Sequence, residues 1–374
     1  MKLSCLQENL RRGLATVSRA VAGKSSLPVL ANVLLATDSG RLKLAATNLE
    51  LGITCWIGAK VDGDGAVTVP ARLFTDMVGG MPNDRVDLNL DGRTQTLHVA
   101  CGRFEANIKG IEADEFPNVP TSAGSRAIAT FPPQALRDAI AQVAFAAATD
   151  DTRPVLAGVL LRLRGSRVQF AAADGFRLAQ RSLELAGAGT ADQDIIVPAR
   201  TLLELSRIID DEHDIEIIVT QSQVLFHTPS LDVVSRLIDG RYPDIDRVIP
   251  TSHTTRAVLD TQEFAKAARL ASFVAASSSN IVRLTLESGG DLGPGRVIVN
   301  ANAAEVGDNR GALDANIGGP GGQIALNVKY LADALAAMKT PQVALEFENA
   351  QSPAVFRPVG ADGYVHVIMP MAVR

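Results

Sequence analysis

A chain of 374 residues has room for two or three ordinary domains, and its 47% hydrophobic and 21% charged residues are typical of a globular protein rather than a disordered or fibrous one. Three cysteines, at positions 5, 55 and 101, exclude a disulfide framework, and no apolar stretch approaches the roughly 18 residues of a membrane-spanning helix. The formal net charge of −5 argues against a basic coat over the whole surface but allows cations to gather on one face.

The first third of the chain contains two predicted helices and several predicted strands. Apolar residues spaced three or four apart predict an opening helix whose buried face carries Leu6, Leu10, Leu14, Val17 and Val21. A second helix is predicted over 70–79, because a proline at a helix start loses no hydrogen bond. Strands are predicted over 29–36, 41–46, 51–57, 66–69, 86–90 and 96–100.

The same order of elements returns twice. Opening helices are predicted over 133–148 and 261–276, the latter with Thr261 as its N-cap. Second helices are predicted over 198–209 and 328–338, and linkers over 120–126 and 250–256.

Short motifs repeat at nearly constant spacing along the chain. The matching segments are 28–35 with 154–161, 68–72 with 196–200, and 116–119 with 242–245. Their offsets are 126, 128 and 126 residues, and 326–329 is a fainter third copy of the Val-Pro-Ala-Arg motif. A period near 125 residues is too long for a solenoid, so each repeat is predicted to be a domain: 1–122, 123–252 and 253–374. Two helices packed on antiparallel sheets in each repeat make the fold class α+β.

The usual signatures of catalysis and metal binding are missing from the sequence. Gly23-Lys24-Ser25 resembles the end of a phosphate-binding loop, but Ser18 stands where that loop needs glycine. Segment 62–65 (DGDG) lacks the later acidic positions of a calcium loop and favours a hairpin turn. The five histidines show no ligand spacing. We therefore predict no catalytic residue, no metal and no cofactor, although an enzyme assembled from scattered residues remains the alternative at this point.

Basic residues recur at matching places in the repeats. Arg72, Arg200 and Lys329 begin the second predicted helix of each unit. Further cations lie on or after the opening helices: Arg11, Arg19, Lys24, Arg137 and Lys266. Any single one could belong to a solvated helix face, but retention in three divergent copies favours contact with a repeating polyanion such as double-stranded DNA, through phosphates and without sequence readout.

The end of the chain is apolar, as Val367-Ile368-Met369-Pro370-Met371. It is either a final core strand or an adaptable surface for several partners, a role in which methionine is common.

In six motifs and over its entire length, the chain resembles the bacterial sliding clamps, the beta subunits of DNA polymerase III. The motifs are 27–30 (LPVL), 69–72 (VPAR), 173–179 (ADGFRLA), 239–244 (DGRYPD), 280–284 (NIVRL) and 368–371 (IMPM). The resemblance implies three similar domains, a head-to-tail homodimeric ring around duplex DNA, and no catalysis. The implied partners are the polymerase catalytic subunit, the clamp-loading ATPase, and other polymerases and repair proteins with short clamp-binding peptides. It also implies a cytoplasmic, nucleoid-associated protein without membrane contact. An enzyme of three similar domains, acting on small molecules, is the alternative.

The resemblance also implies two sets of site residues. A partner-peptide groove would be formed by Leu156, Ala173, Gly175, Phe176, Arg177, Leu178, Pro243, Arg247, Val248, Val367, Ile368, Met369, Pro370 and Met371. At the dimer interface, Phe104 and Ala106 of one chain would face Leu270 and Phe273 of the other. Within the groove, Gly175 would let the peptide backbone approach and Arg177 would hold the peptide's polar end.

Three departures from the family pattern leave open a specialised paralogue or an altered partner preference. Phe176 stands where a histidine is common, the ending Ala372-Val373-Arg374 differs from the usual one, and Asp150 and Asp151 lie near an expected DNA-side loop.

Overall fold

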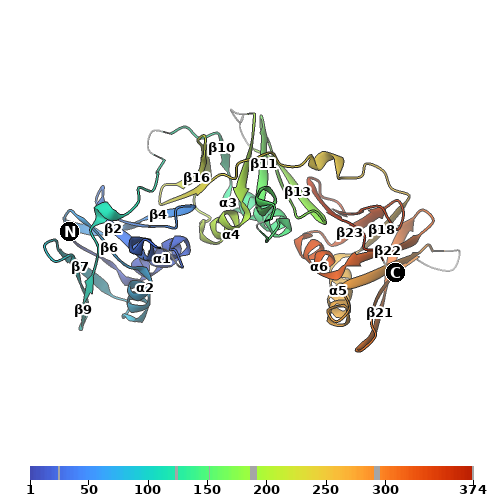
Figure 1. Ribbon diagram of the computed structural model, residues 1–374, viewed down its shortest axis with the longest axis horizontal. Coiled ribbons are helices and arrows are strands. Elements are labelled where there is room, and N and C mark those ends of the chain that lie inside the picture. The colour runs from blue at the N-terminus through green and yellow to red at the C-terminus, as the bar shows by residue number, and fades with distance from the viewer. Residues whose placement is uncertain (24–25, 123–124, 151, 186–191, 290–294, 373–374) are drawn as a thin grey trace. The chain divides into compact units, whose positions relative to one another are not determined.

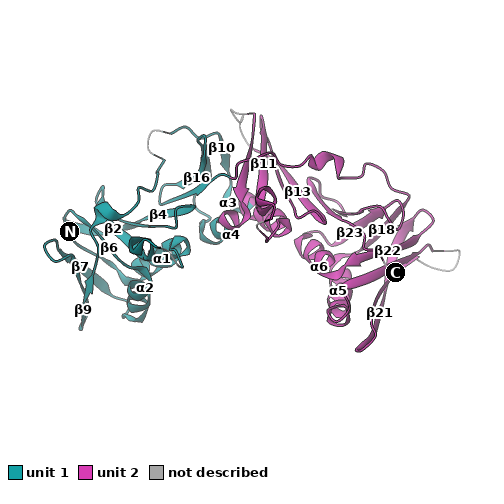
Figure 2. Cartoon of the chain, in the orientation of Figure 1, with its two compact units in different colours: residues 1–134, 204–237 teal, residues 135–203, 238–374 magenta. Residues whose placement is uncertain are grey.

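The computed structural model describes residues 1–374 apart from 24–25, 123–124, 151, 186–191, 290–294 and 373–374. The described residues form helices and antiparallel strands, the α+β composition predicted from the sequence (Figure 1). They divide into two compact units, Met1–Gln134 with Glu204–Leu237, and Ala135–Leu203 with Ile238–Arg374 (Figure 2). The middle repeat therefore contributes strands to both units.

The first unit contains two antiparallel sheets, with strand orders β5-β1-β7-β8-β9 and β10-β15-β16-β17-β4-β3-β2-β6. The strands of the first sheet are β1 (Lys2–Leu6), β5 (Lys60–Gly63), β7 (Arg85–Asp91), β8 (Thr96–Cys101) and β9 (Phe104–Lys109). The strands of the second are β2 (Asn32–Asp38), β3 (Arg41–Thr47), β4 (Leu51–Gly58), β6 (Ala66–Pro70), β10 (Ala129–Phe131), β15 (Ile215–Val219), β16 (Gln223–Thr228) and β17 (Leu231–Arg236).

Two helices of this unit, α1 (Gln7–Val17) and α2 (Ala71–Gly80), pack against each other, and α1 also packs on β4. The predicted helix is wrong at both ends, because Leu6 is exposed at the end of β1 and α1 stops at Val17. Strand β1 pairs with β5 and β7, which come from much later in the chain. Local periodicity could not reveal a strand whose partners are so distant in sequence.

The second unit contains one large antiparallel sheet with the order β14-β11-β12-β13-β25-β24-β23-β18-β21-β20-β19-β22. Its strands from the second repeat are β11 (Gly158–Arg164), β12 (Arg167–Ala173), β13 (Arg177–Glu184) and β14 (Gln193–Pro198). Those from the third are β18 (Thr255–Asp260), β19 (Ile281–Glu287), β20 (Gly295–Ala303), β21 (Gly307–Gly318), β22 (Gly322–Asn327), β23 (Gln342–Phe347), β24 (Ala354–Pro358) and β25 (Tyr364–Ile368).

Helices α5 (Thr261–Ala275) and α6 (Val328–Ala337) pack together, and α5 also packs on β20 and β21. Helices α3 (Pro133–Val143) and α4 (Ala199–Ile208) belong to the second repeat and cross the boundary between the two units. Short 3-10 turns complete the backbone: η1 (Ser18–Ala20), η2 (Pro28–Ala31), η3 (Ala113–Glu115), η4 (Ala144–Ala146), η5 (Pro154–Ala157) and η6 (Ile245–Arg247). Among the described helices, none is long and apolar enough to span a membrane.

Local sequence patterns predicted some helix and strand boundaries correctly and others wrongly. The second helix of each repeat begins and ends within one residue of its predicted bounds. Thr261 is not the N-cap of α5, because Asp260 is, with its Oδ1 accepting a 2.9 Å hydrogen bond from the backbone N–H of Glu263. The predicted strand over 29–36 begins only at Asn32, since Pro28 starts the 3-10 turn η2.

Backbone ladders, rather than linkers alone, join neighbouring repeats. Strand β4 of the first repeat pairs with β17 of the second, and β13 of the second pairs with β25 of the third. We call the surroundings of the β4–β17 ladder the first junction and those of the β13–β25 ladder the second junction. The first lies within the first unit and the second within the second unit.

Candidate functional site

An exposed cation is the second residue of the second helix in every repeat. These residues are Arg72 in α2, Arg200 in α4 and Lys329 in α6. The Arg72 side chain is almost fully exposed and makes a long 4.0 Å ion pair with Asp76. The first turn of a helix carries a partial positive charge that adds to the charge of the side chain, so each position is suited to an external anion.

The other predicted DNA-binding residues differ in their surroundings. Arg11 on α1 and Lys266 on α5 are exposed, Arg137 on α3 is half-buried, and Lys24 lies outside the described residues. Arg19 Nη1 lies 2.6 Å from Glu204 Oε2, and Glu204 Oε1 also accepts a 2.8 Å bond from Arg207. Because Arg19 is held in this intramolecular network, it is a poorer candidate for phosphate contact than the sequence suggested.

Four of the apolar residues predicted for the partner groove meet at one buried cluster in the second junction. Leu156, Leu178 and Val367 belong to it and come from η5, β13 and β25, and Ala173 packs against it. The hydroxyl of Tyr242, another member, accepts a 2.9 Å hydrogen bond from the backbone N–H of Ala173. Burial raises the pKa of Tyr242 to about 12, so the hydroxyl stays neutral. Segments far apart in sequence thus form one apolar floor.

A tight turn over 174–177 forms one wall of this site. Asp174 Oδ1 accepts hydrogen bonds from the backbone N–H groups of Phe176 at 2.9 Å and Arg177 at 3.0 Å. Gly175 has φ of +92°, a conformation that favours glycine. The guanidinium of Arg153 covers the open side of Gly175, where an added Cβ would lie 2.8 Å from Nη1. A peptide backbone could approach Gly175 only after this flexible side chain moved aside.

The Arg177 guanidinium is hydrogen-bonded to other residues of the same chain. Its Nε donates to Asp174 Oδ2 at 3.0 Å, its Nη1 to Asp333 Oδ2 at 2.5 Å and its Nη2 to the Phe145 carbonyl at 2.8 Å. The guanidinium also lies over the Tyr330 ring, 4.4 Å from its centroid, and the side chain is only 10% exposed. These contacts join the turn to α6, so Arg177 positions the wall of the site. Each of its three nitrogens already donates a hydrogen bond within the chain, which does not fit the expectation that it holds a peptide's polar end.

The chain end follows β25 along the same site. The Met369 N–H donates to the Phe176 carbonyl at 2.8 Å, and the Met371 N–H donates to the Ala325 carbonyl at 2.8 Å. Val367 and Ile368 are buried core residues of β25, whereas Met369 is 39% exposed. The core-strand interpretation therefore holds for Val367 and Ile368, and it is wrong for Met369.

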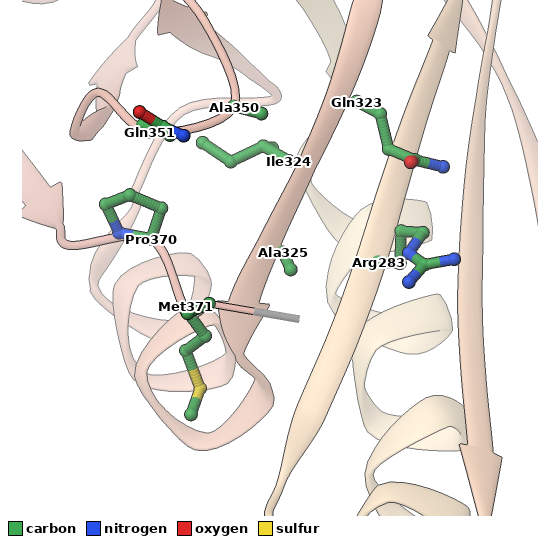
Figure 3. A pocket seen from close by; sticks show the side chains of 9 residues that line it. Arg283, Gln323, Ile324, Ala325, Ala350, Gln351, Pro370 and Met371 are labelled. Carbon is green, nitrogen blue, oxygen red and sulfur yellow. The ribbon is translucent and has the colours of Figure 1, made fainter. Parts of the chain in front are cut away.

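A cavity of about 550 Å³ adjoins the chain end (Figure 3). It is lined by Arg283, Gln323, Ile324, Ala325, Ala350, Gln351, Pro370, Met371 and Ala372. Of these, only Pro370 and Met371 were predicted as site residues. The motif 280–284 contains Arg283 and was the only sequence signal near the rest of the lining.

Exposed apolar side chains flank the buried floor. Phe176 is 60% exposed, and Val248 just after η6 is also exposed. Pro243 lines a second cavity of about 370 Å³ together with Tyr242. Arg247 is exposed and its Nε lies 3.0 Å from Asp244 Oδ2. Exposed apolar groups beside a buried apolar floor are typical of a surface that binds another molecule.

The residues predicted for the dimer interface lie on two exposed surfaces, one in each unit. Phe104 and Ala106 are on β9, an edge strand whose only described partner strand is β8, and Phe104 is 61% exposed. Leu270 and Phe273 are on α5, and Phe273 is 65% exposed. An open strand edge and exposed aromatic side chains are features of surfaces that become covered by association.

The thiols and the buried histidine do not form a reactive centre. Burial raises the pKa of Cys5 and of Cys55 to about 12, so neither is a nucleophilic thiolate. Burial and then the nearby Arg177 charge lower the pKa of His366 to about 3, which keeps its ring neutral. Within the described part of the chain, no group of three or more His, Cys, Asp or Glu residues is placed to hold a metal ion.

Two of the departures noted in the sequence include residues that lie outside the described part of the chain. Asp150 accepts hydrogen bonds from the N–H and hydroxyl of Thr152, whereas Asp151 lies outside the described residues. Ala372 lines the cavity at the chain end, and residues 373–374 also lie outside the described part.

Comparison with known proteins gives one consistent result. Family models for the DNA polymerase III beta subunit match residues 1–120 (N-terminal domain), 130–244 (central domain) and 246–372 (C-terminal domain). The beta sliding clamp of Synechococcus elongatus is 35% identical over 100% of both chains, and that of Synechocystis sp. is 32% identical over 99% of both.

Solved structures agree with these sequence matches. The DNA polymerase sliding clamp from Bacillus subtilis superimposes with a TM-score of 0.94 at 27% identity, covering 100% of both chains. A sliding clamp from Pseudomonas aeruginosa bound to griselimycin gives a TM-score of 0.92 at 29% identity, again covering 100% of both chains.

Proposed function

Since the chain belongs to the family of DNA polymerase III beta subunits, the bacterial beta sliding clamps, we propose that it is a processivity factor that encircles duplex DNA and tethers the replicative polymerase to it. In this role it catalyses no reaction and needs no cofactor. Its work at replication forks would place it in the cytoplasm, on the nucleoid.

The observation that carries the proposal is the cation repeated in all three helix pairs. Arg72, Arg200 and Lys329 occupy one structural position in three divergent repeats, although the chain as a whole has a net charge of −5. A polyanion with regular spacing is the ligand that such a repeat suits, and duplex DNA carries one charge about every 1.7 Å of axis. Contacts to phosphate read no sequence, so the protein could slide.

A ring would be closed by two copies of this chain. The edge strand β9 with Phe104 and Ala106 would meet Leu270 and Phe273 of the partner's α5, and the same contact would be made twice. Part of β21, residues 307–315, pairs with β20 on one side and has no described strand on the other, so it offers β9 a complementary edge. Retention on DNA would then be topological rather than dependent on high affinity.

The second junction would be the docking site for partners. Leu156, Leu178 and Val367 would form the floor, and Phe176, Val248 and Met369 the exposed rim, for the leucine and phenylalanine of a short extended peptide. The polymerase catalytic subunit, the clamp loader and other polymerases and repair proteins would compete for this site. A short peptide must offset its own ordering entropy, so we expect a Kd in the micromolar range, about −8 kcal/mol.

Retention on DNA of different topology tests the proposal. The purified protein is loaded by its clamp-loading ATPase onto a nicked circular plasmid, and the plasmid is then linearised. We expect the protein to stay on the circle through gel filtration and to leave the linear DNA. Equal retention on both forms would show ordinary affinity binding and would overturn the clamp assignment.

A further inference from the structure

The groove-forming turn has a counterpart in the first junction, 126 residues earlier. Asn48 Oδ1 accepts hydrogen bonds from the N–H groups of Glu50 at 3.0 Å and Leu51 at 2.8 Å, the same two bonds that Asp174 makes in the second junction. Leu49 has φ of +75°, in the place of Gly175. The backbone of the turn is therefore built twice.

The remainder of the junction is also duplicated. The Arg236 N–H donates to the Glu50 carbonyl at 2.9 Å, as the Met369 N–H does to the Phe176 carbonyl. A buried cluster beneath the first junction contains counterparts of most of the groove floor, although Gly52 stands in the place of Leu178. Its members Leu30, Ala45, Phe116, Val119 and Val234 take the places of Leu156, Ala171, Tyr242, Ile245 and Val367.

The side chains around this second copy of the site are different. Leu49, which is 50% exposed, stands in the place of Gly175. The exposed, charged Glu50 and Arg236 stand in the places of Phe176 and Met369. Leu49, Glu50, Val119, Val234 and Arg236 are among the residues that line a cavity of only about 80 Å³. Ligand sites usually have volumes of about 300–1,000 Å³.

We propose that Leu49, Glu50 and Arg236 keep the first junction closed to partner peptides, so that each chain offers one groove although its fold builds the groove twice. The inference rests on the proposed docking function of the second junction. It assigns these three residues a role in restricting where partners bind.

The physical reason lies in what an entering peptide would meet. A leucine or phenylalanine side chain would have to displace water from the Glu50 carboxylate and the Arg236 guanidinium without offering either a polar partner. Leu49 also fixes an aliphatic side chain at the turn, where the second junction has only the movable Arg153 guanidinium over Gly175. At the second junction, the equivalent Phe176 and Met369 add apolar contact instead.

Peptide stoichiometry tests the inference in the full-length protein. The probe is a fluorescein-labelled Ala-Leu-Ala-Leu-Phe peptide, titrated into the wild type, into Met369→Glu, into the triple variant L49G/E50F/R236M, and into the triple variant combined with Met369→Glu. We expect one site per chain in the wild type, none in Met369→Glu, two in the triple variant and one in the combined variant. Circular dichroism and sedimentation verify that each variant keeps its fold and self-association.

Different outcomes separate this inference from the proposed function. A folded triple variant that still binds one peptide, and none once Met369→Glu is added, overturns the role of the three residues and leaves the groove intact. One residual site in Met369→Glu alone overturns it as well, because the first junction would already be open. A wild type that binds no peptide overturns the groove itself and the inference with it. If the triple variant does not fold, the milder E50Q/R236M variant should gain a weak second site, and one site there is contrary to the proposal.

Discussion

Individual side chains at the second junction show what sequence motifs can reveal and what they cannot. Leu156, Leu178 and Val367 were predicted by resemblance and do meet in one buried cluster. Tyr330 and Asp333 were missed, although both contact Arg177. A motif identifies Arg177 as special, but the partners of a guanidinium depend on which helix packs beside it, and packing between repeats has no local sequence signal.

Gly175 gives a prediction at this scale. Replacing it with alanine forces a β-carbon into a backbone conformation with φ of +92°, so we expect Gly175→Ala to lower the free energy of unfolding by about 1–2 kcal/mol. Gly79→Ala is the matched control, because Gly79 lies in α2 with nothing within 4 Å of an added β-carbon. That change should be neutral or stabilising by about 0.5–1 kcal/mol. Urea unfolding measures both, and equal effects would contradict the argument.

His366 gives a second residue-scale prediction, for the dependence of stability on pH. Its ring is fully buried and stacked on Phe145 with centroids 5.6 Å apart, and neither ring nitrogen has a described hydrogen-bond partner. Its pKa is lowered to about 3, so below about pH 6.5 the unfolded chain binds a proton that the folded chain refuses. The free energy of unfolding therefore decreases as the pH falls from 6.5 toward 3, because protonation of His366 favours the unfolded chain.

His366→Phe removes the group that binds this proton and keeps an aromatic ring against Phe145. The unfolding free energy of the variant should exceed that of the wild type by a margin that widens as the pH falls from 6.5 to 4. The expected increment is about 1.4 kcal/mol per pH unit. Urea titrations at three pH values suffice, and parallel curves for the two proteins would refute the assignment of the acid loss to His366.

At the scale of helices and strands, the success of prediction depended on where the stabilising contacts lie. The second helix of each repeat was predicted to within one residue, since its start is encoded locally in the 69–72, 197–200 and 326–329 segments. Strands β1, β5 and β9 were missed. They are short strands whose pairing is with residues distant in sequence or across a tight hairpin, so their local pattern of apolar residues is weak.

The free edge of β9 carries the prediction for elements. Phe104 is exposed on this edge and would be buried at both contacts of the proposed ring. Phe104→Ala should therefore weaken dimerisation by about 2 kcal/mol per contact, which is about 4 kcal/mol for the dimer or roughly a thousandfold in Kd. Sedimentation across a dilution series measures the effect. Leu73→Ala serves as a control, because Leu73 is another exposed apolar residue but lies on α2. Unchanged association in Phe104→Ala would remove β9 from the interface.

For the whole molecule, net charge and charge placement must be distinguished. The chain is acidic overall, yet it keeps one exposed cation at the same helix position in each repeat. Composition predicted only that cations could be concentrated on one face, whereas the repeat alignment predicted which ones contact DNA. That prediction came from comparing the chain with itself, a signal that is stronger than any single basic residue.

Reversing the charge of the three repeated cations tests whether they contact DNA phosphates. The triple variant Arg72→Glu, Arg200→Glu and Lys329→Glu should lose most DNA-stimulated loading and processive synthesis, because phosphates would face three carboxylates per chain. Fold and self-association should be retained, since all three side chains are exposed. Lys60→Glu, Arg93→Glu and Arg296→Glu change the net charge equally at other exposed sites and should have little effect. Equal losses in both variants would show that only total charge matters.

The ladders between β4 and β17 and between β13 and β25 also determine how the chain can be divided. A fragment cut at a repeat boundary, such as 1–122, would leave β4 without β17 and would uncover Val29, Leu30 and Ala45, which pack with Ile218, Leu225 and Val234. Such a fragment would have an unpaired strand edge and an exposed apolar core, and it would be expected to aggregate. The repeating segment of about 126 residues is therefore smaller than the segment that completes a core, and one repeat expressed in isolation is expected to be unstable.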